Sequence, residues 1–142
     1  MYENIVLPID LNHGESWEKA LPTALALCQT FNAKLHVVTV LPDYRMPLVG
    51  SFFPADFSEK ARKKLSEAQR KFVDEHVPGD TEVQCHIVEG SPYEGIIRTA
   101  KSVRADLIVM ASHNRHELAD FLVGPNAEHV VRHAGISVMV VR

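Results

Sequence analysis

The sequence predicts a three-layer α/β/α fold built on an open, mainly parallel sheet of five strands, of the Rossmann-like kind. Three observations predict it. β-branched apolar runs alternate with helical periodicities along the chain. Two of these runs are almost wholly apolar, which is typical of parallel strands covered by helices on both faces. The chain has 142 residues, of which 46% are hydrophobic, so it suits one compact domain over residues 1–142.

The first part of the chain contains two expected strands with a helix between them. Residues 4–10, NIVLPID, form a β-branched run, in which Pro8 favours a strand end or an edge position. Apolar residues recur at intervals of three and four from residue 16 to 31, which predicts a helix with Pro22 near its first turn or at a kink. Residues 34–40, KLHVVTV, are the second strand.

A long connection, residues 41–57, fits no period and holds three prolines and several large apolar side chains. It is expected to pack on another part of the molecule. Ser58 is expected to cap the next helix, which is mostly solvated. Its narrow apolar stripe consists of Ala61, Leu65, Ala68 and Phe72.

The next two elements carry clear boundary signals. Residues 81–90 alternate between apolar and polar side chains, which predicts a half-exposed or edge strand. The following helix begins with Ser91 as cap, Pro92 at the first helical position and Glu94 three residues after the cap, a capping-box arrangement.

The last elements are a strand, a short helix and a strand. Residues 106–111, DLIVMA, form the most apolar run and are expected at the sheet centre. Residues 126–133 form a short helix and residues 136–142 the final strand. In such folds a ligand lies beyond the carboxyl ends of the strands, so the candidate loops follow residues 10, 40 and 111.

Composition excludes several classes of partner. With 15 basic and 18 acidic residues the net charge is -3, which provides no broad basic field for nucleic acid or an anionic membrane. The first residues lack a leader pattern, and no apolar stretch is long enough to span a bilayer, so a soluble cytoplasmic protein is expected. Cys28 and Cys85 have no metal or redox spacing, and both are expected to be buried thiols.

The chain has eight histidines but no expected metal site. His129 and His133 are four residues apart on one helix, and His113 and His116 are three apart in a loop. No cysteine or carboxylate completes either set, so structural or solvated roles are expected. Hydrolase and phosphate-loop motifs such as GxSxG, HExxH and GxxxxGK[ST] do not occur, and no catalytic residue is predicted.

Three segments resemble the universal stress protein family over essentially the whole chain: NIVLPID, EGSP and DLIVMASHNRHELADFLVGPNAEHVVRHAGISVMVVR. Nucleotide-binding members carry GxxG, nine residues, then Gly and Ser or Thr. This sequence keeps that frame from Ala111 through Asn114 to Gly124, with Pro125 at the hydroxyl position. The resemblance implies the five-stranded sheet of the adenine-nucleotide alpha-hydrolase-like fold and a homodimer. In many members it also implies an ATP or AMP pocket, where Mg²⁺ can accompany the phosphates.

The resemblance also implies which residues form the pocket. The aspartate that ends the first strand and main-chain groups near the end of the second strand meet adenosine, and the loop and helix start meet the phosphates. Asp10 has an alternative role, in which it only caps the loop that follows it. The implied positions are Pro8, Asp10, Val40, Ala111, Ser112, His113, Asn114, Arg115, Gly124, Pro125 and Asn126.

The replaced residues of the loop differ in how much they should weaken phosphate binding. Asn114 tolerates the left-handed backbone region better than most replacements for glycine. Pro125 removes both an N–H and a hydroxyl, and losing one donor to a charged phosphate costs roughly 1.5 to 3 kcal/mol. Arg115, His113 and Asn126 offer replacement donors, and Pro125 suits the first helical position. The alternative is a turn that merely connects a strand to a helix.

Three functions remain open from the sequence. The first is a regulatory module that binds ATP or AMP. The second is a slow ATPase or autophosphorylating enzyme, for which Ser112 is the nearest hydroxyl acceptor. The third is a nucleotide-free structural dimer. The apolar segment 46–54, with Phe52 and Phe53, is expected to cover the adenine side of the pocket, a partner surface or the domain's own helices.

Assembly is expected to involve the final strand. The run ISVMVV, residues 136–141, holds no proline or inward charge, and an exposed apolar edge of this kind is an association site. The family pairs this strand antiparallel with its copy, a two-fold contact. A homodimer is therefore expected; the alternative is a monomer with a capped edge. The expected interface residues are Val138, Met139, Val140 and Val141.

Overall fold

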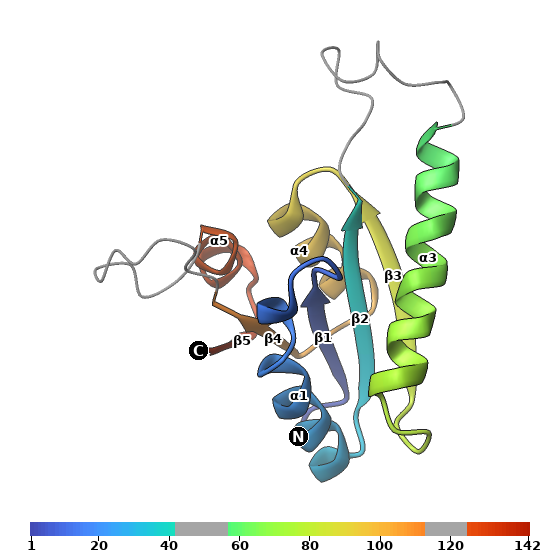
Figure 1. Ribbon diagram of the computed structural model, residues 1–142. Coiled ribbons are helices and arrows are strands. Elements are labelled where there is room, and N and C mark those ends of the chain that lie inside the picture. Colours follow the sequence, from blue (N-terminus) through green and yellow to red (C-terminus); the bar gives the residue numbers. More distant parts are fainter. Residues whose placement is uncertain (42–56, 113–124) are drawn as a thin grey trace.

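Figure 1 shows the computed structural model of the chain, which describes residues 1–41, 57–112 and 125–142. The strands form a five-stranded sheet in the order β3-β2-β1-β4-β5, and every neighbouring pair is parallel. The predicted fold class is confirmed, with an all-parallel sheet. In chain order the elements are β1 (Asn4–Ile9), the 3-10 helix η1 (Gly14–Ser16), α1 (Ala20–Phe31), β2 (Lys34–Leu41), α3 (Phe57–His76), β3 (Val83–Glu89), α4 (Pro92–Ser102), β4 (Leu107–Ala111), α5 (Pro125–His133) and β5 (Ser137–Val141).

Helices cover both faces of the sheet and give the molecule three layers. α1 and α3 pack on one face, and α4 and α5 pack on the other. Successive side chains of a strand point to opposite faces. In β1, Ile5 and Leu7 therefore pack with α1 and α3, whereas Val6 packs with α4 and α5. Each face of the sheet has its own apolar layer, and both layers are closed by helices.

The strand β4 is not at the sheet centre, so the expectation for residues 106–111 was wrong. The centre is β1, and β4 lies between β1 and β5. All five residues of β4 are buried, because helices cover both of its faces. Its apolar composition reflects this double coverage and not its rank in the sheet. The expectation of an edge strand at residues 81–90 is confirmed, since β3 is the outermost strand.

Prolines mark two helix starts as the sequence predicts. Pro22 lies in the first turn of α1, and Pro92 is the first residue of α4, directly after Ser91. Ser91 has the extended backbone of a capping residue but makes no side-chain capping hydrogen bond, so the expected capping box is not formed. The carboxylate of Glu94 accepts a hydrogen bond from the hydroxyl of Tyr93 at 3.3 Å.

Helix α3 buries a polar residue where the sequence predicts an apolar stripe. Ser58 lies inside the first turn of the helix and is not its cap, contrary to expectation. The buried face contains Gln69, Phe72 and Val73, while Ala68 is exposed, so the stripe was wrong at that position. Within residues 1–41, 57–112 and 125–142, no helix, α3 included, combines the length and the apolar character that crossing a bilayer requires.

The buried amide of Gln69 joins α3 to the sheet. Its Nε2 atom donates to the carbonyl oxygen of Val37 at 3.1 Å and to that of His86 at 3.0 Å. The same atom lies 3.1 Å from the hydroxyl of Thr39. These partners belong to β2 and β3, so one side chain bridges two strands. A buried amide with satisfied hydrogen bonds is well accommodated in a core, and apolar periodicity cannot identify it.

One of the two cysteines is buried, in contrast with the expectation for both. Cys28 faces the core from α1, and burial raises the pKa of its thiol to about 11. Cys85 is exposed, because it lies on the edge strand β3. The expectation for Cys85 failed because an edge strand leaves side chains open that an inner strand would cover.

Candidate functional site

The strand order reverses between β1 and β4. From β1 the sheet grows through β2 to β3 on one side and through β4 to β5 on the other. In an open parallel sheet, ligands bind beyond the carboxyl ends of the strands at such a reversal. Asp10 follows β1 and Ser112 follows β4, so the ends of these two predicted loops meet at the reversal, beside the end of β2.

Pro8 opens the sheet at this point. The carbonyl of Asn4 accepts a hydrogen bond from the N–H of Asp106. The backbone N–H and C=O groups of the even-numbered residues of β1 are therefore directed toward β4. The next residues on this side of β1 are Val6 and Pro8. Val6 forms the last pair between the two strands, with Ile108, and Pro8 has no N–H. Both strands continue for three more residues. Pro8 thus lies near a strand end as expected, but in the central strand and not at an edge.

The turn after β1 is held by Asp10 and Ser16. The buried hydroxyl of Ser16 accepts a hydrogen bond from the N–H of Asp10 at 2.8 Å and donates to the carbonyl of Asp10 at 2.9 Å. The carboxylate of Asp10 accepts the N–H of Asn12 at 3.0 Å and lies 2.8 Å from Nδ1 of His13. Asp10 therefore caps the loop, as one of its two expected roles requires. Its side chain remains 52% exposed and can meet a ligand as well.

Val40 turns its backbone toward the same opening. The carbonyl of Leu41 accepts a hydrogen bond from the N–H of Gly90 at 3.2 Å. The backbone groups of Leu41 are therefore directed toward β3, and those of Val40 toward β1. The residue pairs of β1 with β2 end at Ile9 and Thr39. The carbonyl of Val40 consequently lies beyond the last pair of this ladder, above the turn at Asp10. This geometry suits a main-chain contact and leaves the identity of the side chain unimportant.

The end of β4 and the start of α5 form the opposite side of the opening. Ala111 is buried, and the N–H of Ser112 donates to the carbonyl of Val141 at 3.0 Å. α5 begins at Pro125, which confirms this proline at the first helical position. Because β4 and β5 are parallel, α5 leads back from the carboxyl edge of the sheet to the start of β5 (Figure 1). The positive end of its helix dipole is thus at the carboxyl edge.

The structure brings five of the predicted residues to one opening, together with the start of α5. They are Pro8, Asp10, Val40, Ala111 and Ser112. Asn126 is exposed in the first turn of α5. The other predicted loop residues and the apolar segment 46–54 lie outside the described residues; these loop residues are His113, Asn114, Arg115 and Gly124.

Ser16 is a residue of this site that the sequence did not identify. It was expected at the start of the first helix, but it lies in η1, four residues before α1, and is 5% exposed. η1 contacts β4, so the turn that Ser16 holds lies beside the place where β1 and β4 separate. Its only signal in the sequence is a small hydroxyl residue in the loop LNHGES, which does not distinguish a buried clamp from a helix cap.

The structure also contains a buried pair of histidines that the sequence does not indicate. His36 of β2 is 2% exposed, and its Nδ1 atom lies 2.9 Å from Nε2 of His86 in β3. Its Nε2 atom lies 2.9 Å from the side-chain oxygen of Asn4. Burial, together with the nearby His86 and Lys34, lowers the pKa of His36 to about 4. The pair crosses the sheet below the opening and belongs to the core.

The histidines that the sequence did single out on the last helix are stacked on a tyrosine. The ring of His129 lies 4.6 Å from that of Tyr93, at an angle of 22°. His133 follows with its ring 6.3 Å from that of His129. Within the three described ranges, no group of three histidine, cysteine or carboxylate side chains could hold a metal ion. The expected histidine pair at 113 and 116 lies outside those ranges.

The profile of the universal stress protein family matches residues 1–142. The chain belongs to this family. Universal stress protein G of Escherichia coli O157:H7 is 30% identical over 145 residues, an alignment that covers 100% of this chain and 100% of the relative. The resemblance of the opening strand and the last segment to universal stress proteins is thereby confirmed.

Solved structures of universal stress proteins share the fold. One, in complex with cAMP, is 23% identical with a TM-score of 0.63 over 99% of this chain and 97% of that chain. Another, from Archaeoglobus fulgidus in complex with dAMP, is 21% identical with a TM-score of 0.66 over 99% of this chain and 98% of that chain. At these identities the likeness shows a common architecture, and the nucleotides are those of the two proteins that carry them.

Proposed function

We propose that this universal stress protein binds an adenine nucleotide, ATP or AMP, in the opening between the carboxyl ends of β1 and β4. The observation that carries the proposal is the end of the β1–β4 ladder at Val6 and Ile108, caused by Pro8. It creates a gap at the reversal of strand order, where ligands of such sheets bind. The complexes of similar universal stress proteins with cAMP and dAMP support the choice of ligand.

The adenosine part would lie against the ends of β1 and β2. The half-exposed carboxylate of Asp10 can accept hydrogen bonds from ribose hydroxyls, and the carbonyl of Val40 can accept one from the adenine amino group. Acceptors of this kind favour a ligand with several N–H and O–H donors.

The phosphates would lie at the start of α5 and the end of β4. The helix N-terminus at Pro125 favours negative charge, and among the described residues Ser112 after β4 and Asn126 in the first turn of α5 provide polar side chains. Since the described residues hold no metal cluster of their own, Mg²⁺ would enter on the phosphate oxygens of ATP. This chain's contribution is to fix the phosphates and to exclude water from one side of them.

The proposed role is regulatory binding in a stress response, without rapid turnover. A slow ATPase or an autophosphorylating enzyme with Ser112 as acceptor is the alternative, and a nucleotide-free structural dimer is the third candidate. Mass spectrometry of small molecules that co-purify with the protein tests the nucleotide-binding module against the nucleotide-free dimer. Turnover of radiolabelled ATP separates the nucleotide-binding module from the slow enzyme.

We further propose that the chain forms a homodimer through β5. The N–H of Ser112 bonds to the carbonyl of Val141, so Val141 faces β4, and the backbone groups of Val138 and Val140 face outward. Met139 is 37% exposed on this outermost strand. A free apolar edge of this kind favours antiparallel pairing with a second copy, in which one surface meets itself.

A further inference from the structure

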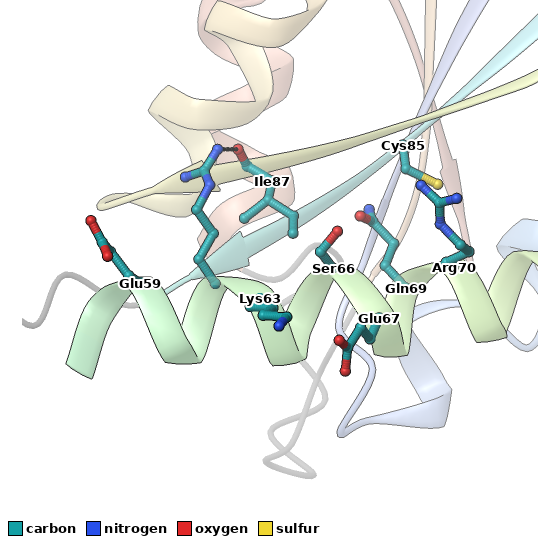
Figure 2. A pocket seen from close by; sticks show the side chains of 9 residues that line it. Glu59, Lys63, Ser66, Glu67, Gln69, Arg70, Cys85 and Ile87 are labelled. Carbon is teal, nitrogen blue, oxygen red and sulfur yellow. Dashed lines mark hydrogen bonds between the residues drawn. The ribbon is translucent and has the colours of Figure 1, made fainter. Parts of the chain in front are cut away.

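The opposite edge of the sheet carries a second feature, which is a groove of about 630 Å³ between α3 and β3 (Figure 2). α3 runs alongside β3 over the length of the strand (Figure 1). The groove lies on the outer edge of the sheet, away from the opening between β1 and β4. Its lining residues are Glu59, Arg62, Lys63, Ser66, Glu67, Gln69, Arg70, Cys85 and Ile87.

The backbone of β3 is available along this groove. The carbonyl of Glu82 accepts a hydrogen bond from the N–H of Leu35 in β2 at 2.9 Å, so even-numbered residues face β2. The N–H and C=O groups of Val83, Cys85 and Ile87 therefore face away from the sheet. The contact of Arg62 agrees with this direction, because its guanidinium reaches the carbonyl of Ile87 at 3.3 Å from α3.

Basic side chains outnumber acidic ones by a small margin beside this edge, with three basic and two acidic residues in the lining of the groove. α3 has six basic and four acidic residues, in a chain whose net charge is -3. Arg62 is paired with Glu89 at 3.1 Å, whereas Arg70 makes no ion pair with any residue in the described ranges. Figure 2 shows Arg70 and Ser66 directed toward β3, while the carboxylate of Glu67 points away from it. Among the described residues, the groove thus presents the guanidinium of Arg70, which has no ion pair there, next to the outward-facing backbone groups of Val83 and Cys85.

We propose that this groove docks an extended, acidic segment of a partner protein, which adds to the outer edge of β3 beside Val83 and Cys85. An added strand gains main-chain hydrogen bonds from the edge, and its alternate side chains face α3. A carboxylate among them pairs with Arg70. Glu89 on Arg62 already shows this type of pairing at the other end of the groove.

The spacing of the helix side chains sets the pattern of the segment. Arg62, Ser66 and Arg70 are four residues apart, so each lies about 6 Å from the next along the helix axis. Side chains on one face of a strand are two residues apart, which is about 6.7 Å. An acidic residue opposite Arg70 therefore places the residue two positions away opposite Ser66, and the residue four positions away beside Arg62. The segment therefore has an acidic residue opposite Arg70 and a small polar residue opposite Ser66. A second acidic residue four positions away lies beside Arg62, whose guanidinium also binds Glu89.

Fluorescence anisotropy with a labelled peptide tests the proposal on the full chain. The probe is the acetylated heptapeptide TEVSVET carrying fluorescein, and the matched peptide TKVSVKT replaces both glutamates by lysine. We expect saturable binding of the first peptide and none of the second. Arg70→Gln should weaken binding about tenfold, as expected for loss of one charge-assisted pair. The control Arg98→Gln, an exposed arginine of α4, should bind as the parent does.

A second variant tests the strand pairing itself. Cys85→Pro removes an N–H that faces outward, a position that tolerates proline on an edge strand, and it should abolish binding, whereas Cys85→Ser should not. Circular dichroism checks that the proline variant folds; if it does not, Arg70→Gln decides. Equal binding of both peptides, or equal affinity of Arg70→Gln and Arg98→Gln, would overturn the proposal. Displacement of the peptide by a single-stranded oligonucleotide of similar charge, with tighter binding, would assign the groove to nucleic acid instead.

Discussion

The Nδ1 atom of His36 lies 2.9 Å from the Nε2 atom of His86, so one hydrogen bond joins the side chains of β2 and β3. The oxygen of Asn4 can only accept, so His36 donates to it from Nε2. With a pKa of about 4, His36 is neutral at pH 7, so its Nδ1 atom accepts a hydrogen bond from Nε2 of His86. A second proton on His36 would break the hydrogen bond and bury a charge.

This pair should make stability depend on pH. Burial lowers the pKa of His36 from 6.5 to about 4, and His86, Lys34 and Glu82 are the charged or titratable groups that act on it. Between these two pH values the unfolded chain binds a proton that the folded chain does not, so stability rises with pH from 4 to 6.5. The rise amounts to about 3 kcal/mol for this group at most.

Urea unfolding at pH 4.5 and pH 7 measures this effect. His36→Gln, which keeps polar contacts without a proton to gain, should show a smaller difference between the two pH values than the parent. The exposed His129→Gln serves as control and should keep the parent's dependence. A parent protein equally stable at both values, or a His36→Gln variant with an unchanged difference, would contradict the assignment.

Ser16 should support both the fold and the proposed site. Ser16→Ala leaves the N–H of Asp10 without its partner, which should lower the free energy of unfolding by about 1 to 3 kcal/mol. It should also weaken ATP binding, because the turn at Asp10 loses its clamp. Chemical denaturation and calorimetry measure the two effects. Ser102→Ala, at an exposed serine, should change stability by less than about 0.5 kcal/mol.

The sequence predicts the elements of the fold, but not the order of the strands or the buried polar residues. Apolar runs and helical periodicities identify the five described strands and the helices α1, α3, α4 and α5, but not η1. Pro22 and Pro92 locate two helix starts, since these signals depend on local backbone chemistry. The rank of β4 in the sheet could not be predicted, because coverage by helices and not position determines its composition. Gln69 and His36 could not be predicted either, since their burial depends on partners in other strands.

The candidate site was predictable where it depends on chain order. Asp10 directly follows β1, Val40 is the last residue but one of β2, and Ala111 ends β4. Parallel strands bring those ends to one edge. The separation of β1 from β4 was not predictable. It depends on which strand lies next to the side of β1 where Pro8 lacks an N–H, and the sequence does not show the order of the strands. The sequence could not show that the buried hydroxyl of Ser16 binds both backbone groups of Asp10.

Pro125 should limit the affinity of the proposed nucleotide site. Pro125→Ser restores an N–H and a hydroxyl at the start of α5, so it should strengthen ATP binding by about one to two decades. Pro92→Ser changes the matching position of α4 and provides the control, which should leave the affinity as it is. Calorimetric titration of both variants measures it. No gain for Pro125→Ser would mean that the phosphates meet another part of the loop.

The β5 edge should control assembly. Val140→Pro removes an N–H that faces away from β4, so it should convert a dimer to a monomer at micromolar concentration while the β4–β5 ladder persists. Light scattering coupled to gel filtration gives the mass. Cys85→Pro makes the same change on the opposite edge strand and should leave a dimer intact. A parent monomer, or a dimer unaffected by Val140→Pro, would show that this edge is not the interface.

Adenine-nucleotide binding is the central claim, and calorimetric titration of the protein with ATP and with AMP tests it most directly. The account predicts saturable binding with a Kd on the order of 1 to 100 μM. Binding should be lost in Gly124→Val, where a side chain blocks close approach of the loop backbone. It should be retained in Gly79→Val, whose added side chain meets open space. No heat of binding from either nucleotide, or equal affinity of Gly124→Val and the parent, would contradict the account.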